Sequence, residues 1–236
     1  MTVTAVFSSD TVSKEYSLDN VQWLTYSEGV VMEDNGSVYF RGKDKAGNYS
    51  EVTSYEVTNI DKVSPTLDIT ADKTTPTNQN VVLTATVSDG TVEYFANGKW
   101  NVGNSLTVTE NGTYQFRVTD AAGNSVTDSI VVNNIDKVAP TLDITADKTA
   151  PTNQNVVLTA AVSDGTVEYF ANGKWNTGNS LTVSENGTYQ FRVTDAAGNT
   201  VTDSIVVNNI DKVAPTLDIT AEIGRASCRE RVCEAV

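Results

Sequence analysis

The side chains best suited to chemistry in this sequence are aspartates placed at expected turns and near linkers. Asp89 and Asp120 fall in turns, Asp136 falls in a linker, and Asp68 follows the preceding linker. Carboxylate oxygens from loops are the hard ligands that Ca²⁺ takes in proteins, so a fold that gathers them at one end could bind calcium. The calcium candidates are Asp68, Asp89, Asp120, Asp136, Asp143, Asp164, Asp195 and Asp211.

A structural role explains the same aspartates without a metal. Asp120 opens the stretch Asp120-Ala-Ala-Gly-Asn124, in which a carboxylate can cap a type I turn and glycine can take the left-handed position after it. Asp136 fits a solvated linker charge, and the sequence has no Asp-x-Asp-x-Asp ligand loop. The sequence therefore favours turn capping, with calcium as the alternative, and requires no cofactor.

The sequence offers no set of residues for nucleophilic catalysis. Histidine is absent, and the two cysteines, Cys228 and Cys233, lie close to the C-terminus. The usual pairings of a nucleophile with a base are therefore unavailable. Paired carboxylates, as in glycosidases, are the remaining option, but these acidic residues recur at turns that explain them without chemistry. We expect that the protein is not an enzyme.

Aromatic side chains could instead form a binding surface. Tyr94, Phe95 and Trp100 fall on one expected hairpin and recur 75 residues later. Sugar rings stack on exposed aromatic rings, whereas a small sandwich without disulfides needs its large side chains in the core. Alternation along the strand places Tyr94 inside and Phe95 outside. Phe95 and Phe170 are therefore the glycan-contact candidates, beside the alternative that the hairpin serves only the core.

The charge of the chain excludes one class of partner. It carries 16 Lys and Arg against 30 Asp and Glu, a formal net charge of −14. Phosphate contacts are made with Lys and Arg, so we expect no nucleic-acid partner. No apolar run approaches the ~20 residues of a membrane span, so we expect no membrane insertion in this part. Residues 1–6 show no signal peptide, which says little because both ends of the chain look cut.

The elements that position these residues recur with a period of 75 residues. Leu67, Leu142 and Leu217 stand in identical Pro-Thr-Leu-Asp-Ile-Thr contexts. The stretch 110–124 returns almost unchanged at 185–199 and more loosely at 33–48. The sequence is therefore an array of repeats, each the size of a small domain.

The stretch 110–124 predicts a turn, a strand and a second turn. Tyr114, Phe116 and Val118 alternate with polar residues, which is the period of a half-buried strand. Before them, Asn111-Gly112 is expected to supply the positive φ angles of a tight turn.

The second repeat predicts a sandwich. Six or seven strands are expected in it, at 66–70, 81–88, 91–95, 99–101, 105–109, 113–119 and 125–132. Short β-branched strands joined by turn residues such as Asn97-Gly98, and no helical periodicity, predict an all-β sandwich. The second and third repeats differ only at positions expected in turns or on outward strand faces, which supports these registers. The differences are Thr75/Ala150, Thr86/Ala161, Val102/Thr177, Thr109/Ser184 and Ser125/Thr200.

The expected domains are 1–61, a first repeat truncated at its N-terminus; 62–136 and 137–211, two complete repeats; and 212–221, the start of a fourth. They are joined by linkers such as Asn134-Ile-Asp-Lys-Val-Ala-Pro-Thr141, which Pro140 stiffens. We therefore expect domains of about 75 residues arranged as an extended rod. Residues 222–232 resemble a translated sequencing adapter, and the repeat pattern breaks after Ala221, so 222–236 is expected to be a non-native tail.

The first repeat departs from the other two. Residues 3–7 are expected to form its first surviving strand, and 15–23 corresponds to 93–100 with small insertions. Val38 stands at the position of Tyr114 and Tyr189, so any hydrogen bond specific to that tyrosine is expected to be missing.

These motifs resemble bacterial immunoglobulin-like domains arrayed in long surface proteins. The resemblance is carried by the Asp-Lys-x-x-Pro-Thr linker, the Tyr-Ser-Leu-Asp…Trp hairpin of 16–23, and the pattern Asn-Gly-x-Tyr-x-Phe-Arg-x-x-Asp-x-Ala-Gly-Asn. It covers residues 1–221 and implies tandem immunoglobulin-like β-sandwiches. Arrays of this family sometimes stiffen their junctions with calcium, which is what the resemblance adds to the aspartate pattern.

The resemblance also implies a function. This function is to serve as a non-catalytic spacer or stalk in a large secreted or cell-surface bacterial protein of adhesin type. The partners would be neighbouring repeats, and a surface glycan or protein ligand bound through domains outside this fragment. Two alternatives stay open: an accessory or carbohydrate-binding module of a secreted glycoside hydrolase, and repeats that themselves bind a host or matrix ligand.

Overall fold

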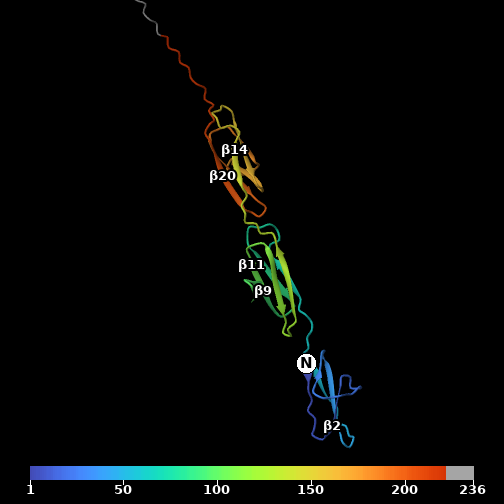
Figure 1. The fold of residues 1–236 in the computed structure, drawn as a ribbon. Coiled ribbons are helices and arrows are strands. Elements are labelled where there is room, and N and C mark those ends of the chain that lie inside the picture. The colour runs from blue at the N-terminus through green and yellow to red at the C-terminus, as the bar shows by residue number, and fades with distance from the viewer. Residues whose placement is uncertain (222–236) are drawn as a thin grey trace, which may run out of the picture. The chain divides into compact units, whose positions relative to one another are not determined.

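The computed structural model describes residues 1–221, and every regular element among them is a β-strand (Figure 1). The chain divides into two compact units, Met1–Asp136 and Lys137–Val236. Among the described residues, the first unit holds two hydrophobic cores and the second holds one. The same residues contain no helix long and apolar enough to cross a membrane. The expected all-β fold is confirmed, whereas the residue at which each repeat begins stays a prediction.

The second repeat forms two antiparallel sheets. One has the order β11-β8-β7, with β7 (Leu67–Ala71), β8 (Val81–Val87) and β11 (Ser105–Val108). The other has the order β10-β9-β12-β13, with β9 (Thr91–Ala96), β10 (Lys99–Val102), β12 (Gly112–Thr119) and β13 (Ser125–Val132). These are the seven strands that the sequence predicts, with ends shifted by at most one residue.

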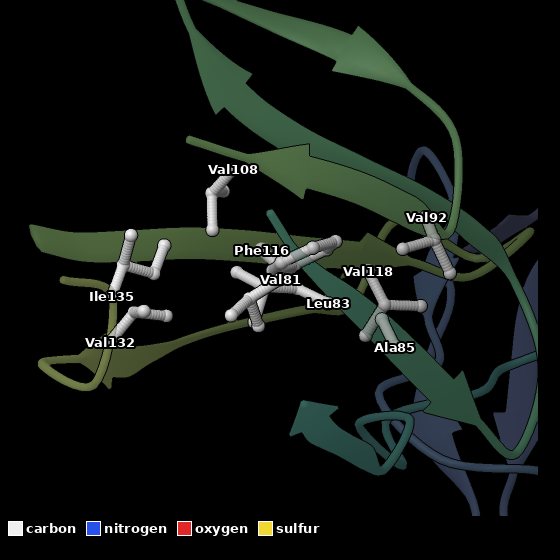
Figure 2. Close-up of a cluster of buried hydrophobic side chains, with 9 residues drawn as sticks. All are labelled: Val81, Leu83, Ala85, Val92, Val108, Phe116, Val118, Val132 and Ile135. Atoms are coloured by element: carbon white, nitrogen blue, oxygen red, sulfur yellow. The ribbon is translucent and has the colours of Figure 1, made fainter. Parts of the chain in front are cut away.

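The core of this repeat lies between the two sheets, because apolar side chains alternate along each strand. Figure 2 shows Leu83 and Ala85 from β8 facing Phe116 and Val118 from β12, and all four are buried. Thr86, the next residue after Ala85, is exposed. The inward and outward positions expected from the period of two are therefore confirmed.

The third repeat has the same two sheets. The first has the order β14-β15-β18, with β14 (Leu142–Ala146), β15 (Val156–Val162) and β18 (Ser180–Val183). The second has the order β17-β16-β19-β20, with β16 (Thr166–Ala171), β17 (Lys174–Thr177), β19 (Gly187–Thr194) and β20 (Thr200–Val207). All five positions that differ between the second and third repeats are exposed in both, as predicted.

The first repeat has a four-stranded sheet of the same kind, but its other sheet is reduced to two strands. The larger sheet has the order β3-β2-β5-β6, with β2 (Thr11–Ser17), β3 (Leu24–Thr25), β5 (Gly36–Asp44) and β6 (Thr53–Val57). The smaller one pairs β1 (Thr2–Val3) with β4 (Val30–Val31). Val38, Phe40 and Val57 are buried between them.

The prediction of a strand over residues 3–7 is wrong for most of its length. The strand β1 ends at Val3, because its partner β4 is only two residues long. Beyond this point the Ala5 N–H donates to Tyr26 Oη at 3.0 Å, where a longer partner strand would offer a carbonyl.

Two expected turns are correct and a third is wrong. Asn97 and Gly98 have φ angles of 53° and 75°, which suit the two-residue turn between β9 and β10. Gly123 has a φ of 95°, the left-handed position expected after Asp120. Asn111 and Gly112, in contrast, are not among the residues with positive φ. The Asn111 side chain binds the backbone of Ile135 instead, and so holds the chain where it leaves the sandwich.

Candidate functional site

Asp120 caps the turn that follows β12. Its Oδ1 accepts the Asn124 backbone N–H at 2.8 Å and its Oδ2 accepts the Asn124 side-chain amide at 2.8 Å. The Gly123 N–H closes the turn on the Asp120 carbonyl at 3.3 Å. Asp120 is 8% exposed, so both carboxylate oxygens are held inside the turn. The same capping recurs between Asp195 and Asn199, and between Asp44 and Asn48.

These turns lower the pKa of the capping carboxylates. The hydrogen bond from the Asn124 side chain is the main cause of the lowered pKa of Asp120, and backbone N–H groups of the turn add to it. Asn199 and Asn48 lower the pKa of Asp195 and Asp44 in the same way. Each donated hydrogen bond favours the ionised form of the carboxyl group.

The other calcium candidates lie in separate places. Asp68 and its counterpart Asp143 lie on exposed positions of β7 and β14. Asp89 accepts the Ser88 hydroxyl at 3.0 Å, as Asp164 accepts that of Ser163 at 3.4 Å.

Asp136 and Asp211 sit at the ends of their repeats. Each donates its backbone N–H to a threonine carbonyl, that of Thr77 at 2.9 Å and that of Thr152 at 2.8 Å. Over residues 1–221 no three acidic side chains converge on one point. Calcium binding stays a prediction that needs its own experiment.

The two glycan candidates lie on the outer faces of the four-stranded sheets. Phe95 and Phe170 are each 40% exposed. Each packs edge-on against the neighbouring tryptophan, Phe95 at 5.4 Å from Trp100 and Phe170 at 5.3 Å from Trp175 between ring centroids. Tyr94 points the other way, toward the core, with its ring 6.3 Å from that of Phe116. Glycan binding at this face stays a prediction.

On the same outer face, an arginine forms an ion pair with a glutamate of the neighbouring strand and stacks on a tryptophan ring. The Arg117 guanidinium donates to Glu93 Oε2 at 2.6 and 3.0 Å, and it lies 4.5 Å from the centre of the Trp100 ring. We call Glu93, Trp100 and Arg117 the brace, because they come from β9, β10 and β12 and tie these strands together. An equivalent brace is formed by Glu168, Trp175 and Arg192 in the third repeat, and by Glu15, Trp23 and Arg41 in the first.

Sequence reasoning did not identify the brace. Glu93 and Arg117 are 24 residues apart and meet only through the pairing of β9 with β12. Their recurrence with the 75-residue period was the available signal. Partly exposed ion pairs of this kind contribute little stability each, and stacking on the ring adds a comparable amount. The brace therefore adds only modestly to the stability of the sheet.

Asparagine side chains bind the backbone where the chain leaves each sandwich. Asn111 accepts the Ile135 N–H at 2.9 Å and donates to the Ile135 carbonyl at 2.8 Å. Asn134 donates to the carbonyls of Lys73 and Thr75 at 3.1 and 2.8 Å. In the third repeat, Asn186 and Asn209 make the equivalent bonds.

The linker that precedes the second repeat is held from both sides. On the side of the first repeat, Asn35 bonds both backbone groups of Ile60, at 2.8 and 2.9 Å. On the side of the second repeat, the Asn124 amide donates to the carbonyls of Asp61 and Val63 at 3.2 and 3.4 Å. We call this set of bonds, from Asn35 and Asn124 to residues 60–63, the linker clamp. The same Asn124 amide also caps Asp120, so the turn and the linker share one residue.

A tyrosine closes the corner before β12. The Tyr114 hydroxyl donates to the Glu110 carbonyl at 2.7 Å, and Tyr189 does the same to Glu185. Burial, and then the charge of Glu110, raise the pKa of Tyr114. In the first repeat the position is Val38, which is fully buried and has no hydroxyl, so the expected loss of this bond is confirmed.

No family model and no curated protein matches the chain. Several solved structures resemble it. One is a structure of a 1.5-MDa bacterial ice-binding adhesin concerned with retention at the host cell surface, with 17% identity, a TM-score of 0.44, and coverage of 81% of this chain and 83% of that one.

A second is a tetra-tandem repeat from the extending region of a large adhesion protein, with 17% identity, a TM-score of 0.26, and coverage of 89% and 69%. A third is the protein SGBP-B of the Bacteroides ovatus mixed-linkage glucan utilization locus, in complex with a mixed-linkage heptasaccharide. It has 13% identity and a TM-score of 0.19, and the match covers 84% of this chain but only 60% of that one.

The capped turns predict a loss of stability in acid. The folded-state pKa values of Asp44, Asp120 and Asp195 lie below the ordinary value of 3.8, so the unfolded state takes up protons first as pH falls. Their stabilisation is therefore complete above that value and disappears as pH falls through it toward the lowered pKa values. We expect the melting temperature to fall over this range.

Replacement of two caps tests the cause of this acid loss. The double variant Asp120→Asn, Asp195→Asn should melt lower at neutral pH and lose less on acidification. The matched control is Asp68→Asn, Asp143→Asn, which removes two exposed strand carboxylates. If the cap variant loses as much stability in acid as the parent chain does, the capping carboxylates are not the cause.

Proposed function

We propose that the chain is a run of non-catalytic spacer repeats from a large secreted or cell-surface bacterial protein of adhesin type. The observation that carries this proposal is the linker clamp. Ile60 is hydrogen-bonded by Asn35, and Asp61 and Val63 by Asn124, so the linker backbone is held by side chains of both repeats that it joins.

A proline and the hydrogen bonds that follow it also restrict bending of the linker. Pro65 fixes its own φ angle and restricts Ser64 to extended conformations. One residue further on, the Thr66 N–H donates to Ser88 Oγ at 3.1 Å, and the Ser88 N–H donates to the Thr66 carbonyl at 3.4 Å. Stretches of this kind act as stiff spacers, whereas Gly/Ser-rich linkers act as flexible tethers.

Each repeat supplies its own core, which suits a structure whose length is set by copy number. The buried residues of the second repeat's hydrophobic core all fall within 81–135, and those of the third repeat's core within 156–210. Adding a copy therefore requires no new core contact, as in other repeat proteins. The net charge of −14 opposes close approach of parallel stalks. A ligand-binding region would lie in domains outside residues 1–221.

Distance distributions between the first and second repeats test the linker clamp. Nitroxide labels at the exposed positions Ser27 and Thr107, in a chain with both cysteines replaced by serine, report this distance by pulsed electron paramagnetic resonance. We expect one narrow distribution, which Asn124→Ala broadens because it removes the bonds to the linker carbonyls.

The matched control for this experiment is Asn48→Ala. Asn48 makes the same two bonds to Asp44 that Asn124 makes to Asp120. Over residues 1–221 the Asn48 side chain donates to Asp44 and to no linker carbonyl, so its loss should leave the distribution unchanged. A broad distribution in the parent chain, or equal broadening by both variants, would contradict the proposal.

Glycan binding is the second candidate function, favoured by the exposed Phe95 and Phe170 beside their tryptophans. It would fit an accessory or carbohydrate-binding module of a secreted hydrolase, or repeats that are themselves adhesive. We expect the parent chain to bind on a glycan array and Phe95→Ala, Phe170→Ala to lose that binding. The control Val131→Ala, Val206→Ala removes two other exposed apolar side chains and should bind as the parent does. An array without signal counts against this function.

Calcium is proposed as an added stiffener of the linkers, not as a requirement for folding. Loop carboxylates such as Asp136 and Asp211 are its expected ligands. If they bind the ion in the folded state, mass action raises the melting temperature by several degrees in calcium relative to EDTA. Magnesium at equal concentration is the control for ionic strength. Superimposable melting curves in calcium and EDTA would remove this proposal.

A further inference from the structure

The sequence contains five Asn-Gly pairs, and the structure places them in two different environments. Asn35, Asn111 and Asn186 each precede a glycine that begins a strand, which is β5, β12 or β19. Asn97 and Asn172 each form, with the glycine that follows, a two-residue turn between paired strands. In an Asn-Gly pair the backbone nitrogen can approach the asparagine side chain closely, because glycine has no Cβ to hinder it. The environment then decides which of these asparagines reacts.

The reaction is an internal attack that releases ammonia. The backbone nitrogen of the glycine loses its proton and bonds to the asparagine Cγ. The bond from Cγ to Nδ2 breaks, and Nδ2 leaves as ammonia with the proton from the glycine nitrogen. Water then opens the resulting imide ring at one of its two carbonyl carbons. Opening at Cγ gives aspartate, and opening at the backbone carbonyl carbon gives isoaspartate, in which the main chain runs through the side chain. The net change converts a neutral amide to an acid, which is ionised at neutral pH.

Three of the asparagines hold both ends of their amides in hydrogen bonds. Asn111 Oδ1 accepts the Ile135 N–H at 2.9 Å, and its Nδ2 donates to the Ile135 carbonyl at 2.8 Å. Asn35 and Asn186 make the same pair of bonds, at 2.8 to 2.9 Å, to the isoleucine that ends their own repeat. Attack on Cγ requires the side chain to turn toward the following glycine, which breaks both bonds. Loss of two such bonds lowers the population of the reactive side chain by about tenfold or more.

The other two asparagines are free of such bonds. Over residues 1–221, the side chains of Asn97 and Asn172 have no hydrogen-bond partner in the protein, and both residues are exposed together with the glycines after them. No atom lies within 4 Å of the place where a Cβ would stand at Gly98 or Gly173, so neighbouring groups do not crowd the attacking nitrogen. Exposed turns open locally at low cost in free energy. A local rearrangement of this turn is enough to bring the glycine nitrogen to Cγ.

We propose that Asn97 and Asn172 are the sites at which the folded protein spontaneously converts asparagine to aspartate and isoaspartate. Asn35, Asn111 and Asn186 are protected by their bonds to isoleucine. The reacting groups belong to the protein's own turn and water is the only co-reactant, so no enzyme is required. The inference does not depend on the spacer function or on glycan binding, since it needs only the two turns and the bound amides.

Isoaspartate at these positions alters the outer face of the four-stranded sheet. The first turn joins Ala96 to Lys99, which are paired across β9 and β10, and isoaspartate adds one methylene to the main chain between them. The next pair along these strands is Phe95 with Trp100. Because the length of a turn fixes the register of its hairpin, the longer turn displaces Trp100 from Arg117. The conversion therefore disrupts the brace and the glycan candidate together, while the core residues of β12 stay in place.

Mass spectrometry of tryptic peptides tests the proposal site by site. Trypsin cuts after Lys and Arg, so each Asn-Gly pair falls in a different peptide: 15–41, 74–99, 100–117, 149–174 and 175–192. The folded full chain is incubated at mildly alkaline pH below its melting temperature, and is then digested at lower pH. Fragmentation of each peptide shows whether the asparagine before glycine has gained the mass of an acid. We expect this gain in 74–99 and 149–174 about tenfold faster than in the other three peptides.

The same chain in denaturant is the control for intrinsic reactivity. All five asparagines then have a glycine neighbour and no folded contact, so we expect them to convert at similar rates. If Asn111 or another bound asparagine converts as fast as Asn97 in the folded chain, the proposal is wrong. It is also wrong if Asn97 and Asn172 stay unchanged in the folded chain while the denatured chain converts.

Two variants test the effect on the outer face. N97G/N172G removes the reacting amides and leaves Gly-Gly, which also forms this two-residue turn. The near-ultraviolet circular dichroism of Trp100 and Trp175 should decline in the parent during the incubation and stay constant in this variant. N97D/N172D carries the product charge without the extra methylene and should begin with the signal of the fresh parent. An equal decline in N97G/N172G and the parent would contradict the displacement of Trp100 by the modified turn.

Discussion

Backbone groups that the short strands leave unpaired must find partners elsewhere, and in this chain asparagine side chains supply them. A backbone N–H or carbonyl without a partner is costly once it is removed from water. Asn35, Asn111 and Asn186 each bond both backbone groups of an isoleucine at the end of a repeat. Asn124 then bonds the carbonyls of the linker that precedes its repeat. These amides hold the chain where the sheets end, and the spacer function that we propose depends on them.

Each sandwich has only a small hydrophobic core. Each complete repeat has no disulfide, and its core is centred on one fully buried phenylalanine, Phe116 or Phe191, packed among valines and leucines. The brace adds order on the outer face, since Arg117 joins Glu93 and Trp100 from neighbouring strands. A tyrosine at the corner of β12 fixes the entry to the strand, whereas the first repeat has the fully buried Val38 at this position. Such domains can be repeated without new contacts, which is what a stalk requires.

The sequence predicted the structure best where residues close together in the sequence determine it. The alternation of Tyr114, Phe116 and Val118 defined strand and core, because inward and outward positions follow directly from a period of two. Asn97-Gly98 identified its turn for the same reason.

Asn111 was predicted to form a tight turn, but its side chain instead bonds the backbone of Ile135, which lies 24 residues away and could not be inferred from local sequence. The brace and the linker clamp were missed, since both depend on pairings distant in sequence. Residues 3–7 were assigned to a longer strand because a sequence shows no sign of a missing neighbour. Pattern identified the turn that Asp120 caps and the outward position of Phe95, but pattern alone does not show what these side chains bind.

The central claim is that length grows with the number of repeats, and small-angle X-ray scattering on chains of different repeat number tests it most directly. One or two further copies of residues 65–139 would be inserted before Pro140, each with its own linker. If the linkers are stiff, every inserted copy increases the maximum dimension by the same amount. The radius of gyration then lies far above that of a compact globule, which is about 18 Å for a chain of this length. If the maximum dimension instead grows by less with each copy, the linkers bend freely or the repeats fold back on one another, and the spacer account is wrong.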